Sequence, residues 1–320
     1  AHPVGTGPYK FDSWSRGDSI TLVAYDGYWG EKPAIDEVVY RFIADPGTRL
    51  SALLAGEVDV ITNVLPEVMD QLPKAVVGPS TEHIVLPLDT ADGITSDVRV
   101  RRALNLAIDK DAINDQLFGG LTQTDAGQML APADFGFDPE TKAFPYDPDA
   151  ARALIEEAGA TGKTITLVGE AGRWLKDREL VEAVGGFWSE IGLVPDLQIL
   201  EWSDYLATVY DRSKRPDAYY IVGSNELFDA DRPFRQFYSP EGNLSSNNIE
   251  ELAPIVEAAG MESDTAKRLE LYQQASRIAH EQAILVWLNT LPVIYGVSER
   301  LEWTPRADAQ IFAREMDIKE

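Results

Sequence analysis

The sequence predicts an α/β fold in two lobes, because the 320-residue chain changes character twice along its length. Residues 1–91 are rich in strand-forming runs, residues 92–283 alternate strands with helices, and residues 284–320 return to strand-like sequence. A chain of this length usually forms two domains. We therefore expect a discontinuous, β-rich first lobe made of 1–91 and 284–320, and a continuous α/β second lobe made of 92–283. The crossings near 86–92 and 284–292 are expected to lie side by side as a hinge.

The first 91 residues read as strands around a single helix. Two runs partly alternate apolar and polar side chains, as half-buried strands do. Asp45 and Pro46 then supply a helix N-cap and a first helical residue, and Gly56 ends the helix. The elements predicted here are strands at 19–25, 38–43 and 58–61 and a helix that begins at Pro46.

The second lobe is predicted to open with two amphipathic helices. Apolar side chains recur at helical spacing over 97–118, which predicts one long helix. Residues 119–146 are rich in Gly, Pro and Asp and read as loop. A second helix begins at the cap signature Asp147-Pro148 and ends at Gly159.

Strands and helices then alternate. Apolar runs at 164–169, 194–200 and 217–222 are separated by amphipathic helices at 177–191 and 203–211. This alternation predicts a parallel sheet flanked by helices. Gly185-Gly186 lies inside the first helix at a cost of about 1 kcal/mol per glycine, and close helix packing is the expected reason. Further predicted elements are helices at 249–259 and 265–281 and a strand-like run at 284–297 that Pro292 interrupts.

Composition excludes several functions. The net charge is −25, from 53 acidic and 28 basic residues, and such a surface repels nucleic acid and anionic lipid. There is no cysteine, which excludes thiol catalysis, disulfides and cysteine metal sites. The three histidines lack metal-ligand spacing, and no nucleophile or dinucleotide motif is present. We therefore expect no catalytic residue, no metal, no cofactor and no nucleic-acid partner.

Targeting signals are not evident in the chain. No apolar run approaches the ~20 residues that a membrane helix needs. The first residues carry neither the basic start nor the apolar stretch of a signal peptide. A mature secreted protein would look the same, so this observation does not place the protein in the cytoplasm.

Three loops leave the carboxyl ends of the predicted parallel strands, which is the edge where open α/β sheets bind ligands. Each loop mixes aromatic, amide, hydroxyl or charged side chains. Such a mixture suits a site that stacks an apolar body and fixes its polar ends. The candidate ligand-binding residues are Arg173, Trp174, Trp202, Tyr205, Ser224, Asn225 and Glu226, with Asp89 and Thr90 expected nearby from the hinge.

Several motifs together carry a family resemblance. The most specific is 97–109 (DVRVRRALNLAID), and the others are 5–11 (GTGPYKF), 28–30 (YWG), 49–59 (RLSALLAGEVD), 147–148 with 158–159, and 295–298 (YGVS). These motifs extend over nearly the whole chain. They resemble family 5 of the extracytoplasmic solute-binding proteins, the peptide- and nickel-type receptors of ABC transporters.

The resemblance implies a periplasmic-binding-protein-like clamshell, hinged between two lobes, that closes on a ligand and docks on ABC permease subunits in the membrane. It also implies a periplasmic or other extracytoplasmic location, at the membrane through the transporter. Family members carry a further stretch before the GTGPYKF motif. We therefore expect the first lobe to be incomplete, residues 1–90 to bury less apolar surface than 92–283, and the full-length protein to be a monomer.

The ligand class stays open in the sequence. Oligopeptide binders of the family often carry a Trp and, three residues on, an Asp that pairs with the peptide amino terminus. Gly223 and Glu226 stand at the most similar positions here, so Glu226 is a candidate partner for a cation. Arg173 is a candidate partner for a carboxylate or phosphate. Nickel chelates, sugars, opine-like conjugates and short peptides are all compatible with these side chains.

Two functions from different classes compete. The first is the substrate-binding component of an ABC importer, which captures a peptide-like or other small polar solute between two lobes and delivers it to a membrane permease. The alternative is a carboxylate-dependent hydrolase that uses the acidic loop residues. Binding that shifts a melting curve without turnover distinguishes the first from the second.

Overall fold

The computed structural model describes residues 3–319, and the chain divides into two compact units. One is formed by Ala1–Ser80 with Pro292–Glu320, and the other by Thr81–Leu291. The sequence places these boundaries at 91/92 and 283/284 instead. They differ because two strands next to the expected crossings, β6 (Glu82–Pro87) and β12 (Leu285–Thr290), pair with each other inside the second unit.

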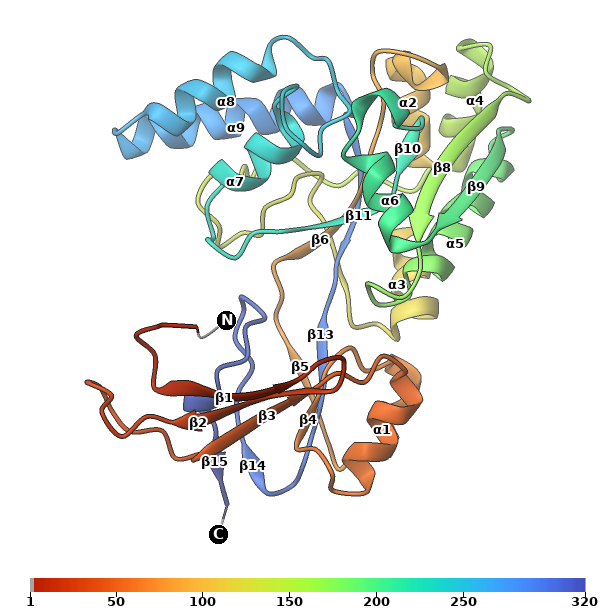
Figure 1. The fold of residues 1–320 in the computed structure, drawn as a ribbon. Coiled ribbons are helices and arrows are strands. Elements are labelled where there is room, and N and C mark those ends of the chain that lie inside the picture. The colour runs from red at the N-terminus through yellow and green to blue at the C-terminus, as the bar shows by residue number, and fades with distance from the viewer. Residues whose placement is uncertain (1–2, 320) are drawn as a thin grey trace. The chain divides into compact units, whose positions relative to one another are not determined.

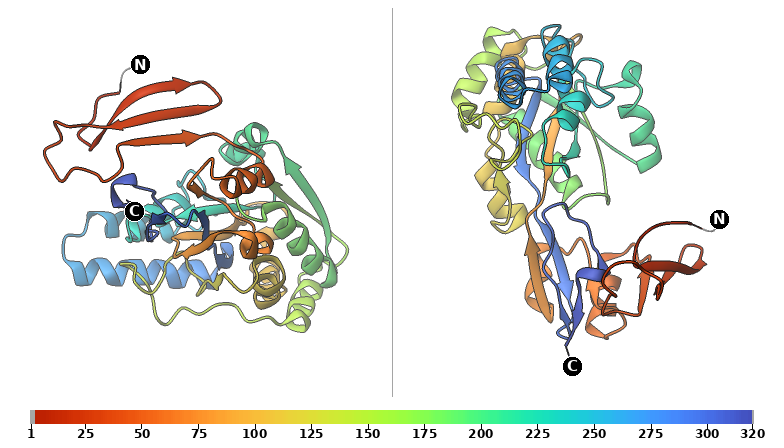
Figure 2. Two further views of the ribbon diagram at one scale, coloured as in Figure 1. Left: turned by 90° about the horizontal axis from the view of Figure 1, so that it is seen from below. Right: turned by 90° about the vertical axis from the view of Figure 1, so that its left-hand side faces the viewer.

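The first unit consists of small antiparallel sheets and one helix (Figure 1). The three strands nearest the N-terminus form a ribbon that both views of Figure 2 show. Helix α1 (Pro46–Leu54) begins as predicted, because the Thr48 N–H donates to Asp45 Oδ1 at 2.7 Å. The strands, in sheet order, are β1 (Tyr9–Ser15), β2 (Ser19–Ala24) and β3 (Glu37–Arg41); β4 (Val60–Ile61), β13 (Val293–Val297) and β5 (Lys74–Gly78); and β14 (Leu301–Glu302) with β15 (Asp317–Ile318).

Apolar side chains of the first unit are poorly buried before residue 80. A small core forms around Tyr295, Trp303 and Met316 near the end of the chain. By contrast, large apolar side chains face solvent at Val4, Trp14, Tyr25, Trp29, Val39, Tyr40, Phe42, Leu54 and Val77. The weaker burial expected for residues 1–90 is therefore present in the structure.

The second unit contains two sheets, of which only one was predicted. The parallel sheet is confirmed, in the order β10 (Ala218–Tyr219), β8 (Thr164–Glu170) and β9 (Val194–Leu200). The other sheet is antiparallel, in the order β11 (Ile221–Ser224), β6, β12 and β7 (Gln123–Thr124). The predicted strand 217–222 splits at Tyr220, so that its two halves belong to different sheets.

Helices cover both sheets. The single helix predicted over 97–118 is wrong, because Ala107 ends α2 and Asp109 caps α3 by accepting the Ala112 N–H at 2.9 Å. The helices are α2 (Val98–Leu106), α3 (Lys110–Phe118), α4 (Pro148–Glu157), α5 (Asp177–Glu190), α6 (Trp202–Val209), α7 (Asp231–Pro233), α8 (Leu252–Met261) and α9 (Thr265–Glu281).

The antiparallel sheet separates two hydrophobic layers. On β6, Ile84 and Leu86 pack into one layer with Trp188, whereas Val85 packs into the other with Tyr205. Both faces of the strand are therefore buried, which explains its unbroken apolar run. Six apolar side chains on the helices of this unit divide into two groups: Leu104, Ile108 and Trp188 are fully buried, and Leu154, Phe187 and Leu269 are half-buried.

Close packing explains only one of the two adjacent glycines in α5. A side chain at Gly185 would lie 2.8 Å from Leu197 on β9, so close packing requires this glycine as expected. Nothing lies within 4 Å of the corresponding position at Gly186, which is exposed. The packing explanation is therefore wrong for Gly186.

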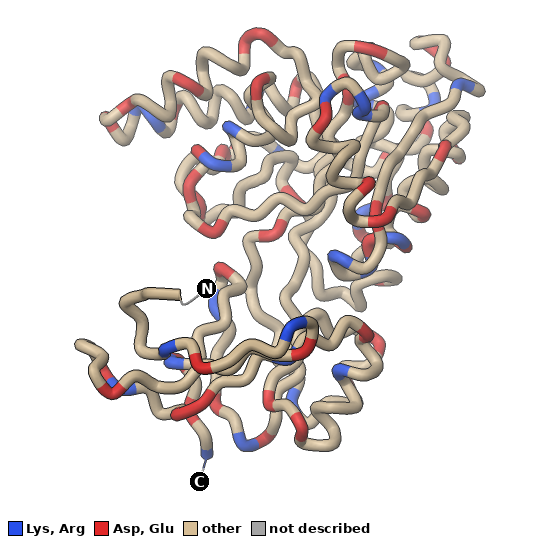
Figure 3. The backbone as a smooth tube through the Cα atoms, viewed as in Figure 1, with Lys and Arg blue, Asp and Glu red and all other residues tan. Residues whose placement is uncertain are grey.

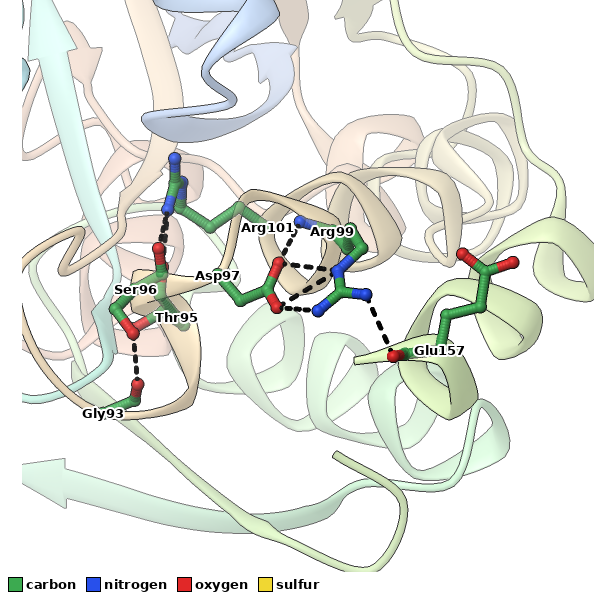
Figure 4. Close-up of polar contacts among 7 residues, drawn as sticks. All are labelled: Gly93, Thr95, Ser96, Asp97, Arg99, Arg101 and Glu157. Atoms are coloured by element: carbon green, nitrogen blue, oxygen red, sulfur yellow. Dashed lines mark hydrogen bonds and ion pairs between the residues drawn. The ribbon is translucent and has the colours of Figure 1, made fainter. Parts of the chain in front are cut away.

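Arg101 joins the start of α2 to the end of α9. Its side chain is buried, and Nη1 donates to the carbonyls of Thr95 at 2.8 Å and Ser96 at 2.9 Å (Figure 4). Its Nε donates to the Gln282 carbonyl at 2.8 Å. Arg101 thus supplies the donors for three carbonyls from two distant segments.

Charge is spread over both units. Asp and Glu residues occur along the whole trace, interspersed with Lys and Arg (Figure 3). Over residues 3–319, no helix combines the length and the apolar character that crossing a membrane requires.

Candidate functional site

The loop after β8 is built around the carboxylate of Asp177, the first residue of α5. Its Oδ2 accepts the backbone N–H groups of Gly172, Arg173 and Trp174, each at 2.9 Å. Its Oδ1 accepts the Arg178 N–H at 2.8 Å. Backbone N–H groups that converge on an anion form a nest, which holds the loop in one conformation. The side chains of Arg173 and Trp174 therefore project from a well-fixed backbone.

Arg173 and two tryptophans form one group at this edge. The guanidinium carbon of Arg173 lies 5.4 Å from the ring centroid of Trp174 and 5.9 Å from that of Trp202, which is cation–π range. The two indole rings meet edge to face, with centroids 5.9 Å apart. Trp202 is 42% exposed and Arg173 is exposed. The group therefore offers a positive charge beside an aromatic surface.

Ser224 is the last residue of β11, and Glu226 follows it in the next loop. Ser224 Oγ donates to Glu226 Oε1 at 2.8 Å, and Arg232 forms an ion pair with Oε2. The side chains of Glu226 and Arg232 are 30% and 42% exposed. In the pairing of β11 with β6, Ser224 lies opposite Glu82. Burial raises the pKa of Glu82 and the charge of Arg173 opposes this rise, so Arg173 and Glu82 interact electrostatically.

Tyr205 and Asn225 reach the same region but are fully buried. The hydroxyl of Tyr205 donates to the Tyr220 carbonyl at 2.6 Å. Asn225 Nδ2 donates to Asp134 Oδ2 at 2.9 Å. These two predicted site residues therefore stabilise their loops from inside, and the sequence carries no signal that separates them from their exposed neighbours.

Asp89 and Thr90 lie at the other end of β6 from the candidate site. A strand rises about 3.3 Å per residue, so Asp89 lies roughly 20 Å from Glu82 along the strand direction. There the Asp89 N–H donates to the Asp217 carbonyl at 2.9 Å, and Thr90 Oγ1 donates to Asn248 Oδ1 at 2.5 Å. The structure therefore does not bring these residues to the edge that carries Arg173. Their expected position depended on a crossing near residue 90, whereas the chain already enters the second unit at Thr81.

A buried carboxyl that the sequence analysis missed lies behind the Arg173 loop. Glu170 ends β8 and is only 1% exposed. Burial, followed by the hydrogen bond and the charge of Asp177, raises the pKa of Glu170 to about 8. This rise favours the protonated form of Glu170 near neutral pH. Nothing in the sequence marks it, whereas Asp177 stands at the start of a predicted helix, where acidic residues are common.

A buried ion pair braces the strands beside the site. His83 Nδ1 lies 3.0 Å from Asp125 Oδ1, and each side chain is 2% exposed. Thr290 Oγ1 donates to the same carboxylate oxygen at 2.7 Å. Burial alone lowers the pKa of His83, but the charge and hydrogen bond of Asp125, with the charge of Asp134, raise it above its usual value. Asp125 follows β7, so the pair and Thr290 together join β6, β7 and β12.

Metal binding has little support in this geometry. Within the part of the chain that the structure describes, no three His, Asp or Glu side chains gather closely enough to hold an ion.

Solved structures with the same fold are solute-binding proteins. NikA from Brucella suis in complex with Fe(III)-EDTA has a TM-score of 0.89 at 23% identity, with 98% of this chain and 68% of that chain covered. AgaA in complex with agropinic acid, from A. tumefaciens R10, has a TM-score of 0.84 at 25% identity, with 100% and 68% covered. The fold class is therefore that of the periplasmic binding proteins.

The family follows from the sequence itself. Residues 1–245 match the bacterial extracellular solute-binding proteins, family 5 Middle, and the chain belongs to this family. It is 27% identical to the dipeptide-binding protein of Escherichia coli over 302 residues, with 88% of this chain covered. It is 29% identical to heme-binding protein A of Haemophilus influenzae over 323 residues, with 93% covered. The chain spans about half of each of these relatives, 55% in both cases. Both are named as binding proteins, so they give no support to the hydrolase alternative.

Proposed function

We propose that the protein is the substrate-binding component of an ABC importer, which captures a peptide-like or other small polar solute and delivers it to a membrane permease. The observation that carries the proposal is the group formed by Arg173, Trp174 and Trp202 at the carboxyl edge of the parallel sheet, in a chain of this family. On this account the protein performs no reaction, and it acts outside the cytoplasm.

The chemistry of the edge selects a class of ligand. The exposed guanidinium of Arg173 provides a forked donor for a carboxylate, and the adjacent indoles provide a surface for an apolar or planar body. Glu226 already pairs with Arg232, so a ligand cation competes with that arginine for the carboxylate. A small solute with a carboxylate at one end fits these features best. Short peptides, opine-like conjugates and anionic metal chelates belong to this class, and solved relatives carry an agropinic acid and an Fe(III)-EDTA ligand.

Replacing Arg173 by alanine is expected to weaken binding of a carboxylate ligand about 10- to 100-fold. A hydrogen bond to a charged group contributes about 1.5–3 kcal/mol, and each 1.4 kcal/mol is a factor of ten in affinity. The measurement is a calorimetric titration of a bound dipeptide or opine against the wild type and Arg173→Ala. Arg178→Ala is the matched control, because Arg178 is exposed and pairs with Glu182 on α5.

Equal affinities of the wild type and Arg173→Ala would remove Arg173 from the site. Glu226→Ala tests the other candidate contact by the same titration, and unaltered affinity there would restrict the site to the Arg173 side. The melting temperature of each variant, measured without ligand, separates a binding defect from a folding defect.

The remaining expectations stay predictions. They are clamshell closure of two lobes formed by 1–91 with 284–320 and by 92–283, docking on the permease subunits, and a monomeric full-length protein without a cofactor. Lobe closure predicts a ligand-dependent decrease of the radius of gyration in small-angle scattering.

A further inference from the structure

Two carboxyl groups behind the Arg173 loop are coupled to each other. The carboxylate of Asp177 is surrounded by four backbone N–H groups, three of them from the loop itself. The Glu170 side chain lies against Asp177 at the end of β8 and is 1% exposed. A carboxylate that accepts several N–H groups is well stabilised as an anion, whereas a second buried charge beside it is costly.

Of the groups around Glu170, Arg173 is the one that favours its charge, through its backbone N–H and its guanidinium. The groups that face it are the carboxylate of Asp177 on α5, the hydroxyl-bearing rings of Tyr205 on α6 and Tyr220 before β11, and Arg173 in the loop. Glu82 on β6 adds a further negative group beside Tyr220. Arg173 is exposed, so it stabilises a charge on Glu170 only in part.

We propose that Glu170 and Asp177 act as a positioning pair for the loop 171–176, in which a protonated Glu170 lets the Asp177 carboxylate hold the loop, and ionisation of Glu170 releases it. The inference deepens the proposed function, because the loop carries Arg173 and Trp174. Neither carboxyl group touches the ligand on this account. Alkaline pH is therefore expected to loosen the ligand edge without unfolding the unit.

The direction of the pH effect follows from the raised pKa of Glu170. In the unfolded chain this carboxyl ionises near pH 4.3, whereas in the folded protein it stays protonated up to about pH 8. The folded state therefore binds more protons between these values, and its stability falls as the pH rises through them. The stabilising hydrogen bond to Asp177 is fully present at pH 7 and is lost as the pH passes 8.

Amide hydrogen exchange of the loop tests the inference without any ligand. The protection factors of the Gly172, Arg173 and Trp174 amides, corrected for intrinsic rates, are compared at pH 7 and pH 9. We expect the protection factors of the wild type to be about tenfold lower at pH 9 than at pH 7, because pH 9 lies one unit above the pKa of Glu170. In Glu170→Gln the amide side chain keeps its hydrogen-bond donor at both values, so protection should be independent of pH.

Two further variants complete the experiment. Asp177→Asn is expected to lower protection at both pH values, because a neutral amide holds the N–H groups less strongly. Glu182→Gln, an exposed carboxyl on the same helix, should behave as the wild type. The proposal is overturned if the wild-type protection is equal at pH 7 and pH 9, or if Glu170→Gln shows the same decrease as the wild type. Since no ligand is used, failure here is distinct from failure of the proposed function.

Discussion

Replacing Trp188 by alanine is expected to destabilise the second unit by about 3–5 kcal/mol, the range for loss of a buried tryptophan. Trp188 is fully buried in the layer between α5 and the antiparallel sheet. Its Nε1 also donates to the Leu104 carbonyl at 3.2 Å, so the substitution leaves that acceptor without its donor. For a unit of this size the melting temperature should fall by roughly 10 °C.

Trp202→Ala is the matched control for this experiment. Trp202 is 42% exposed, so its removal should change the melting temperature by no more than a few degrees. Thermal unfolding followed by circular dichroism measures both variants. Equal destabilisation by the two substitutions would contradict the assignment of Trp188 to the core and of Trp202 to the surface.

Replacing Arg101 by leucine is expected to destabilise the second unit by about 3 kcal/mol or more. The substitution leaves the buried carbonyl of Thr95 and the partly buried carbonyls of Ser96 and Gln282 without their shared donor, and a buried unsatisfied group costs about 1–3 kcal/mol. Removal of a buried charge offsets part of this loss. Burial also lowers the pKa of Arg101 to about 10, which shows how much the core disfavours its charge.

Arg102 provides a control on the same helix. It is exposed and donates to the Glu281 carbonyl, so Arg102→Leu should cost less than about 1 kcal/mol. Urea unfolding at fixed pH compares the two variants. If Arg101→Leu were as stable as Arg102→Leu, the three hydrogen bonds that Arg101 donates would contribute nothing measurable to the stability of the unit.

Local signals in the sequence predicted the elements well. Asp45 and Asp147 cap helices as expected, and the apolar periodicity of residues 177–191 correctly identified α5 and its buried face. These predictions succeed because caps and periodicity depend on neighbours within a few residues. The apolar spacing continues from α2 into α3, so the sequence predicted one helix there. The cap at Asp109 nevertheless separates the two helices.

Long-range pairing was predicted only in part. The expected neighbourhood of the segments 86–92 and 284–292 is confirmed, because Leu285 pairs with Pro87, but the apolar run of β6 carried no information on its second partner, β11. The two units divide at 80/81 and 291/292, so Asp89 and Thr90 lie inside the second unit. The loops after β8 and β9 do share an edge of the parallel sheet, where Trp174 meets Trp202, because alternating strands and helices place such loops together. The third expected loop instead follows β11 of the antiparallel sheet.

The buried side of the site could not be predicted either. Glu170 looks like any polar residue that ends a strand, and only the fold shows that it is enclosed beside Asp177. Tyr205 on α6 and Asn225 in the loop after β11 were expected at the site, but both side chains are buried. Sequence position therefore identified the loops of the site, whereas burial decided which side chains reach its surface.

The protein is expected to bind a small polar solute and to leave it unchanged. The most direct measurement is a thermal-shift screen of the purified protein against di- and tripeptides, glutathione, opines, sugars and nickel–histidine complexes, followed by mass spectrometry of the recovered compound. We expect at least one carboxylate compound to raise the melting temperature saturably and to be recovered intact, with the shift abolished in Arg173→Ala. A compound that is converted during incubation, or a shift of the same size in Arg173→Ala, would contradict the account.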